Sequence, residues 1–291
     1  MTGVTPGAAA AGFPVETVDV QHVVVPLDGS PFAERALPVA AWLASDLAAD
    51  VHLVEVVRPG EDSEGAVRYL DTVARRQQAA AWDVVEHREV GEALAEVVRA
   101  RPGRLACLAT HGRDRSATLL GSVAASLLDR SRRPVIVVGP EARAVTAADA
   151  PVVVAVDGTR RDEALVAVAL GWAARLSRRL EIVTVAEPAP PGFRDGQPPP
   201  RAHGPADPEG YVAALVARAA DAGVPVGSQV AYDPVGVRDG LVPLLDRTAA
   251  LVVLGSRRRA GLSRVVLGSH AARIVHDARV PALIVPRPDD T

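Results

Sequence analysis

GSRRRAGLSRVVLGS, residues Gly255 to Ser269, follows a short run of apolar residues and leads into a helical pattern. The apolar run, Leu251 to Leu254, is typical of a buried strand. The first amide groups of a helix have no partners within the helix, and the helix dipole favours an anion beside them. The order strand, glycine-marked loop, helix therefore indicates a cradle for phosphate.

An imperfect copy of this stretch occurs earlier in the same chain. Matched residues in the first parts of the two copies are 129 positions apart, and those in the last parts are 147 positions apart. The longer spacing comes from a proline-rich insertion within 187–210 and from one extra residue in the loop itself. Two constant spacings joined by a local insertion indicate a duplicated domain. The matched pairs are Asp28 and Asp157, Val56 and Val185, Gly121 and Gly268, and Pro134 and Pro281.

Each copy alternates short apolar runs with helical patterns, which predicts an α/β fold with a parallel sheet covered by helices on both faces. In the first copy we expect strands over 23–27, 51–57, 84–90, 105–109 and 135–138, and helices after Ser30, around 65–82, over 92–99 and from Gly121. The same pattern restarts at Val152. The resulting domains are 20–140 and 151–288, with a linker at 141–150 and a disordered tail at 1–19.

Composition excludes several classes of function. All 32 basic residues are Arg, which rules out the lysine of a P-loop and Schiff-base chemistry. The net charge of -3 comes from interspersed charges and does not favour nucleic acid. The single cysteine, Cys107, and scattered histidines predict no metal site. No apolar run reaches the roughly 20 residues of a membrane span, and no leader sequence is recognisable, so we expect a cytoplasmic protein that binds no membrane.

The candidate site follows from the ends of the strands. Ligands of open parallel sheets bind beyond the carboxyl ends of the strands, where the strand order reverses. Asp28 and Asp157 follow their first strands, and the glycine loops follow their fourth strands. An aspartate there can accept hydrogen bonds from an adenine or ribose edge while the helix start meets phosphate. Each Asp-Gly-hydroxyl sequence taken alone also fits an ordinary turn with a helix cap.

The two copies resemble the universal stress protein family over about 23–138 and 152–286. The loop pattern of that family is Gly, two residues, Gly, nine residues, then Gly followed by Ser or Thr. In the second half Gly255, Gly268 and Ser269 match, while Arg258 stands at the second glycine. In the first half Gly112, Gly121 and Ser122 match, Ala109 stands at the first glycine, and the spacer has eight residues. VPLDGS and AVDGT upstream, and PVIVV and PALIV downstream, support the resemblance.

The resemblance implies Rossmann-like domains of the adenine nucleotide alpha hydrolase type, each with a five-stranded sheet of order 3-2-1-4-5, paired through their last strands as an internal pseudo-dimer. It implies ATP or a related adenine nucleotide as the ligand, with or without Mg²⁺. The implied binding residues of the first half are Leu27, Asp28, Val56, Ala109, Gly112, Gly121, Ser122 and Val123. Those of the second half are Val156, Asp157, Val185, Gly255, Arg258, Gly268, Ser269 and His270.

The departures from the pattern leave two functions open. Where glycine supplies a positive φ, a Cβ at Arg258 costs about 1 kcal/mol or more and can block phosphate, whereas its guanidinium can also pair with phosphate. The first function is a nucleotide-binding stress-response or signalling module. The alternative is a ligand-free dimerisation or scaffold protein with degenerate loops, in which Arg258→Gly would create binding. No nucleophile–base–acid set is recognisable, so we expect a binding protein and not an enzyme, with slow ATP hydrolysis and homodimer formation left open.

Overall fold

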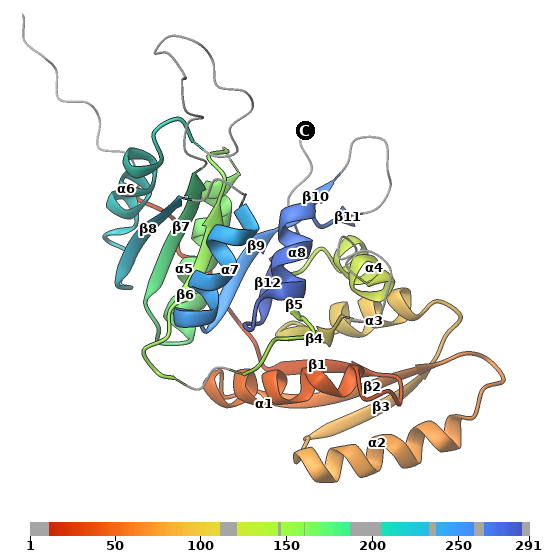
Figure 1. Cartoon of the computed structure of the whole chain (residues 1–291). Helices are drawn as coiled ribbons and strands as arrows, with labels where there is room; N and C mark the ends of the chain where they lie inside the picture. Colours follow the sequence, from red (N-terminus) through yellow and green to blue (C-terminus); the bar gives the residue numbers. More distant parts are fainter. Residues whose placement is uncertain are drawn as a thin grey trace, which may run out of the picture.

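One sheet runs through both halves of the chain in the computed structural model (Figure 1). The structure describes residues 12–110, 121–144, 147–159, 161–186, 205–232, 237–258 and 265–286. The first half contains β1 (His22–Leu27), a 3-10 turn (Ala33–Arg35), α1 (Ala36–Asp46), β2 (Asp50–Val57), α2 (Ser63–Gln77), β3 (Ala81–Glu86), α3 (Val90–Arg99), β4 (Arg104–Ala109), α4 (Ser122–Ser131) and β5 (Val135–Val138).

The second half repeats this succession. It contains β6 (Val152–Val156), α5 (Asp162–Arg175), β7 (Leu180–Ala186), α6 (Pro208–Ala219), β8 (Val226–Tyr232), α7 (Val237–Thr248), β9 (Leu251–Gly255), α8 (Ser269–Asp277) and β12 (Ala282–Val285). Between β9 and α8 lies a short antiparallel pair, β10 (Arg257–Arg258) and β11 (Val265–Val266). The sequence predicted a loop between this strand and this helix. Part of that loop forms the antiparallel pair instead, in which Arg258 lies opposite Val265.

The strand order confirms the predicted fold. The ten strands lie in the order β3-β2-β1-β4-β5-β12-β9-β6-β7-β8, so each half has the order 3-2-1-4-5. All neighbours are parallel except β5 and β12, which pair antiparallel at the centre with Ile136 opposite Leu283. The halves therefore join through their last strands, and each covers the sheet edge that the other would expose.

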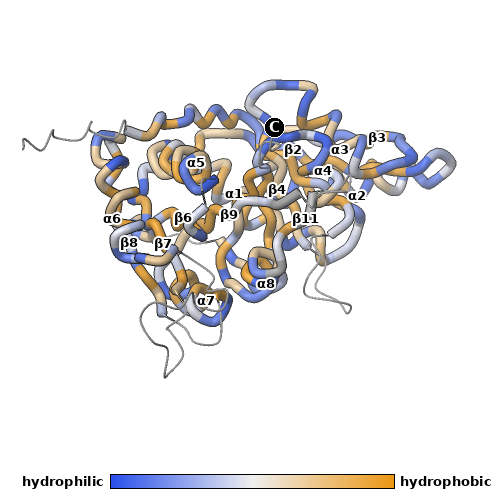
Figure 2. The backbone as a smooth tube through the Cα atoms, turned by 90° about the horizontal axis from the view of Figure 1, so that it is seen from above, coloured by the Kyte–Doolittle hydropathy of each residue, from blue (hydrophilic) through white to orange (hydrophobic). Residues whose placement is uncertain are grey.

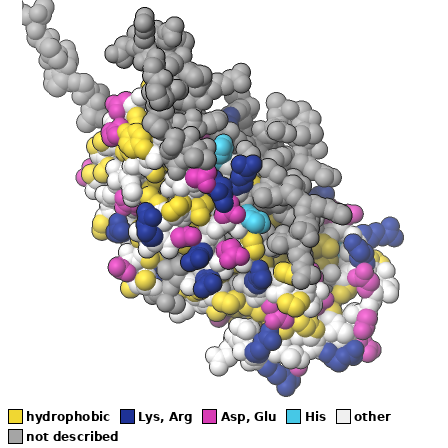
Figure 3. All heavy atoms as spheres, in the orientation of Figure 1, with side chains coloured by type: hydrophobic (Ala, Val, Ile, Leu, Met, Phe, Trp, Pro, Cys, Tyr) yellow, Lys and Arg dark blue, Asp and Glu magenta, His cyan; other side chains and the backbone are white. Residues whose placement is uncertain are grey.

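Helices cover both faces of this sheet. α1, α2, α5 and α6 contribute to the hydrophobic core on one face, and α3, α4, α7 and α8 to the core on the other. The central strands are apolar in consecutive positions because both of their faces are buried; Val135 to Val138 are all fully buried. Seen from above in Figure 2, hydrophobic segments gather along the inner strands and hydrophilic ones along the outer loops. On the face shown in Figure 3, basic and acidic side chains are interspersed.

The second helix ends earlier than the sequence predicted. The helical pattern indicated a helix over 65–82, but α2 ends at Gln77 and Trp82 lies in β3. Gln78 adopts the left-handed conformation at φ 53°, which terminates the helix. Trp82 then pairs with Leu53 of β2, so the sheet ladder overrides the local helical pattern.

The first helix begins later than predicted. The Ser30 hydroxyl accepts a hydrogen bond from the Ala33 amide at 3.2 Å and so caps a 3-10 turn, after which α1 begins at Ala36. Pro38 is therefore in the first turn of α1. Proline within a helix predicts a kink, but its missing N–H has no partner to lose in the first turn, so Pro38 gives no cause for one.

Residues 12–19, which the sequence assigns to the tail, pack against the second half of the molecule. Phe13 is 8% exposed, and the Arg218 guanidinium of α6 lies 4.3 Å from the centre of its ring. A Cβ on Gly171 of α5 would lie 2.1 Å from the Glu16 carbonyl oxygen, so only glycine allows this close approach. The part of the tail before residue 12 lies outside the described residues, and the predicted domain boundaries remain predictions. Among the helices described, none is long and apolar enough to cross a membrane.

Candidate functional site

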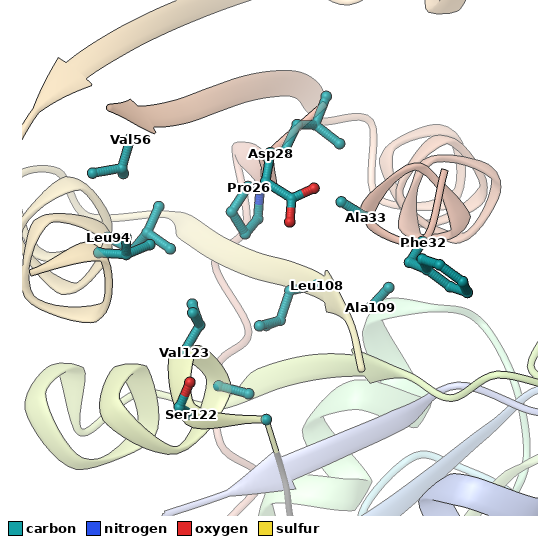
Figure 4. A pocket seen from close by; sticks show the side chains of 14 residues that line it. Pro26, Asp28, Phe32, Ala33, Val56, Leu94, Leu108, Ala109, Ser122 and Val123 are labelled. Carbon is teal, nitrogen blue, oxygen red and sulfur yellow. The ribbon is translucent and has the colours of Figure 1, made fainter. Parts of the chain in front are cut away.

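A cavity of about 190 Å³ opens at the carboxyl ends of β1, β2 and β4 in the first half (Figure 4). It lies between the end of β1 and the start of α4, where the strand order reverses, as expected for an open parallel sheet. The lining residues are Pro26, Leu27, Asp28, Phe32, Ala33, Val56, Val90, Leu94, Leu108, Ala109, Gly121, Ser122, Val123 and Ala124.

The walls of this cavity are apolar. Val56 and Leu94 stand on one side and Leu108 on the floor in Figure 4, and they come from β2, α3 and β4. Among the lining residues described, only Asp28 and Ser122 have polar side chains. Ligand sites typically combine an apolar enclosure with a few oriented polar groups, so the cavity has the composition of a small-molecule site.

Asp28 presents its carboxylate to the cavity because a turn reverses the chain directly after β1. Gly29 makes this turn at φ +75°, which an L side chain rarely adopts. The Ser30 amide donates to the Asp28 carboxylate at 3.0 Å, so the turn orients the side chain that it carries. Asp28 is exposed and points into the space beside Ala33 and Leu108 in Figure 4.

The start of α4 faces Asp28 across the cavity. Gly121 precedes the helix in an extended conformation, and Ser122 and Val123 begin it. A Cβ added to Gly121 would meet no atom of the described residues within 4 Å, so none of these residues covers the helix start. The dipole and unpaired amides of the first turn favour an anion, whereas Asp28 favours a hydroxyl or amino donor. The two ends of the cavity thus suit the opposite ends of a nucleotide.

Glu55 and Tyr69 lie close enough to Asp28 for its charge to act on them. Burial, and secondarily the Asp28 charge, raise the pKa of the Glu55 carboxyl. The Tyr69 hydroxyl of α2 donates to Glu34 at 3.0 Å, and burial followed by this bond raises the tyrosine pKa. Arg76 pairs with the same Glu34 carboxylate. These contacts tie the 3-10 turn before α1 to α2, and Ala33 of the same turn lines the cavity.

Comparison with known proteins agrees with this architecture. The sequence profile described as "Universal stress protein family" matches residues 19–139 and 150–286, which together make up most of the chain. The chain belongs to the universal stress protein family.

Solved structures show the same tandem fold. A universal stress protein from Archaeoglobus fulgidus DSM 4304 is similar over 92% of this chain and 98% of its own, with 18% identity and a TM-score of 0.65. A functionally unknown protein from Pseudomonas aeruginosa PAO1 is similar over 93% of this chain and 94% of its own, with 16% identity and a TM-score of 0.56. At these identities the likeness concerns the fold.

The structure brings together the predicted residues of the first half of this universal stress protein. All of those it describes line the cavity, and Gly112 lies outside the described residues. They are Leu27, Asp28, Val56, Ala109, Gly121, Ser122 and Val123.

The predicted residues of the second half occupy the corresponding strand ends. Val156 ends β6 with Asp157 after it, Val185 lies in β7, Gly255 ends β9, and Gly268 to His270 begin α8. The two loops leave their strands in the same way. The Thr110 amide, after β4, donates to the Val138 carbonyl of β5, and the Ser256 amide, after β9, donates to the Val285 carbonyl of β12, both at 2.9 Å. Arg258 lies in β10, where its backbone pairs with Val265.

Sequence reasoning missed part of the cavity and one acidic residue. Phe32, Ala33, Val90 and Leu94 line the wall although no motif marks them. Asp162 of the second half is fully buried and accepts several hydrogen bonds. The spacing Thr159-x-x-Asp162 is that of a capping box and could have singled it out. Among the described residues, no group of three or more His, Cys, Asp and Glu side chains could hold a metal ion.

Proposed function

We propose that this universal stress protein binds ATP or a related adenine nucleotide in the cavity of its first half. The observation that carries the proposal is the cavity itself, with Asp28 at one end and the open start of α4 at the other. The apolar walls at Val56 and Leu108 suit a base, Asp28 suits the ribose hydroxyls, and the α4 amides suit phosphate.

The size of the cavity sets how a nucleotide would lie. About 190 Å³ is below the roughly 300 Å³ at which drug-sized pockets begin, so it suits the base and part of the sugar. The phosphates then extend past Gly121 and Ser122. The polar side chains among the described lining residues are those of Asp28 and Ser122, which can hydrogen-bond to a ligand and so support a binding role.

The paired halves suggest how binding is read out. α4 of the first half contacts β11 of the second, so a ligand at the start of α4 lies close to the seam between the halves. In the proposed role, nucleotide occupancy alters the surface around this seam and hence the association of the protein with a partner or with a second chain.

The proposal is tested with the full chain as purified. Denaturation followed by anion exchange should release an adenine nucleotide, and the stripped protein should give saturable heat when titrated with ATP and Mg²⁺. Protein that carries no nucleotide and gives no heat would refute the proposal. Loss of ATP turnover on further purification, with binding retained, would support a binding protein over an enzyme.

The second candidate function is that of a scaffold protein that binds no ligand. The loop between β9 and α8 favours this function for the second half. The backbone of Arg258 is engaged in a ladder with Val265, so this part of the loop is organised by the chain itself. If the whole protein is a scaffold, neither half binds ATP in the native chain, and Arg258→Gly creates a site.

A further inference from the structure

The turns that follow β1 and β6 have nearly the same sequence but different surroundings. In the second half, one oxygen of Asp162, Oδ2, accepts hydrogen bonds from the Asp157, Gly158 and Thr159 amides at 3.0, 2.8 and 3.1 Å. The Tyr211 hydroxyl of α6 donates to the same oxygen at 2.8 Å. Asp162 is the first residue of α5 and Arg161 is the N-cap, so these bonds to the preceding turn are not the capping of this helix.

The residue that corresponds to Asp162 in the first half is Ala33. Both lie five positions after the aspartate that ends the first strand, and Ala33 lines the cavity. Alanine has no side-chain oxygen with which to reach the turn. Tyr69 of α2 donates to Glu34, while Glu163, the counterpart of Glu34, pairs with Arg218 of α6. In both halves the glutamate beside this position therefore pairs with the second helix, while the position itself is an alanine in one half and a buried carboxylate in the other.

A second observation separates the two turns. A Cβ built on Gly158 would lie 3.0 Å from the Pro205 nitrogen, so the chain before α6 packs directly over this turn. A Cβ built on Gly29 would meet no atom of the described residues within 4 Å. Among the described residues, therefore, nothing packs over the turn after β1, whereas the chain before α6 packs over the turn after β6.

We propose that Asp162 closes the nucleotide site of the second half from within, so that each chain binds one adenine nucleotide, in the first half. The proposal rests on the proposed function. The Asp162 carboxylate already provides an anionic acceptor for the turn amides and occupies the place that Ala33 leaves to the cavity. It also stands beside Asp157, the counterpart of Asp28, so the end of the site that suits the ribose hydroxyls holds two carboxylates in this half.

Reciprocal substitutions test this inference. Titration of the stripped native chain with ATP and Mg²⁺ should give one site. Asp162→Ala, which copies the first half, should raise the stoichiometry to two, and Ala33→Asp, which copies the second half, should weaken binding at least tenfold. Glu163→Ala is the matched control, because it removes the adjacent carboxylate, which pairs with Arg218 outside the turn, and should leave one site.

Hydrogen exchange measures the closure without any ligand. In the native chain, amides of 157–159 should exchange more slowly than those of 28–30, and Asp162→Ala should remove the difference. Two sites in the native chain, unaltered binding in Ala33→Asp, or equal exchange of the two turns would each overturn the inference. If Asp162→Ala does not unfold cooperatively, the variant is not properly folded. The affinity of Ala33→Asp for ATP and the exchange rates of the native chain then test the inference without it. Absence of binding in the native chain and both variants, with unequal exchange, would refute the nucleotide proposal and leave the closed turn intact.

Discussion

Two aspartates with the same local sequence have different environments in this protein. Asp28 is exposed on the cavity and is oriented by the Ser30 amide. Asp157 lies beside Asp162, and burial together with the Asp157 charge raises the pKa of Asp162. The difference arises from one residue a turn further along the chain, since Ala33 leaves the space that Asp162 fills. The same three-residue motif therefore stands in two different environments.

Asp28→Ala should weaken the binding of ATP at least tenfold. The substitution removes hydrogen bonds to a charged acceptor, each of which contributes about 1.5–3 kcal/mol, and tenfold corresponds to about 1.4 kcal/mol. Isothermal titration of both proteins measures the effect. Asp157→Ala is the matched control and should leave the affinity of the first half unchanged; equal losses in the two variants would contradict the assignment.

At the scale of the element, β2 shows how one strand serves packing and site together. Its consecutive residues Leu53 and Val54 belong to the cores on opposite faces of the sheet, and Val56 reaches the cavity at the carboxyl end. Near its other end, His52 is 6% exposed, and its Nε2 lies 2.9 Å from an Asp83 carboxylate oxygen of β3. Burial lowers the pKa of His52 more than Asp83 raises it.

The stability of the protein should therefore fall as the pH drops below about 6.5. A histidine whose pKa is lower in the folded than in the unfolded state binds fewer protons when folded, so protonation favours unfolding in that range. Urea unfolding at pH 7 and pH 5 measures the free energy, and His52→Gln should show a smaller decrease. NMR titration should give a pKa below 6.5 for His52, lowered further in Asp83→Asn. A pKa above 6.5 would contradict the prediction.

At the scale of the whole molecule, Arg178 connects the two halves and the linker. Its side chain is 5% exposed, forms a 3.3 Å ion pair with Asp46 of α1, and lies over the Trp42 ring at 5.6 Å. It also donates to the carbonyls of Ala147 and Ala150 at 2.6 and 2.9 Å. One buried guanidinium of the second half thereby holds a helix of the first half and the chain that joins them.

Arg178→Ala should lower the free energy of unfolding by about 3 kcal/mol, because it removes a buried guanidinium together with its ion pair to Asp46 and its hydrogen bonds to the Ala147 and Ala150 carbonyls. Urea unfolding of the full chain measures the loss. The neighbouring Arg179 is the control: its side chain is 48% exposed and pairs with Glu181, so Arg179→Ala should change stability by less than about 1 kcal/mol. Similar losses in both variants would show that Arg178 is not a connection between the halves.

The sequence was sufficient for much of the fold because its signals are local or periodic. Apolar runs such as Val135 to Val138, glycine at turns, and the constant spacing between the copies predicted the strands, the duplication and the first-half cavity residues. The prediction from sequence failed at Trp82, where pairing with Leu53 of β2 outweighed the local helical pattern. Strand pairing joins residues that are far apart in the chain, so a local pattern does not reveal it.

By itself, the sequence determined that this protein consists of two related α/β halves with an aspartate and a glycine-marked helix start at corresponding strand ends. Only the tertiary structure decided that Phe13 packs on the second half, that Arg178 joins the halves, and that Asp162 and Pro205 cover the second turn. The physical reason is that a hydrogen bond or a close contact depends on which segments meet in space, whereas strand and helix formation follow from neighbouring residues.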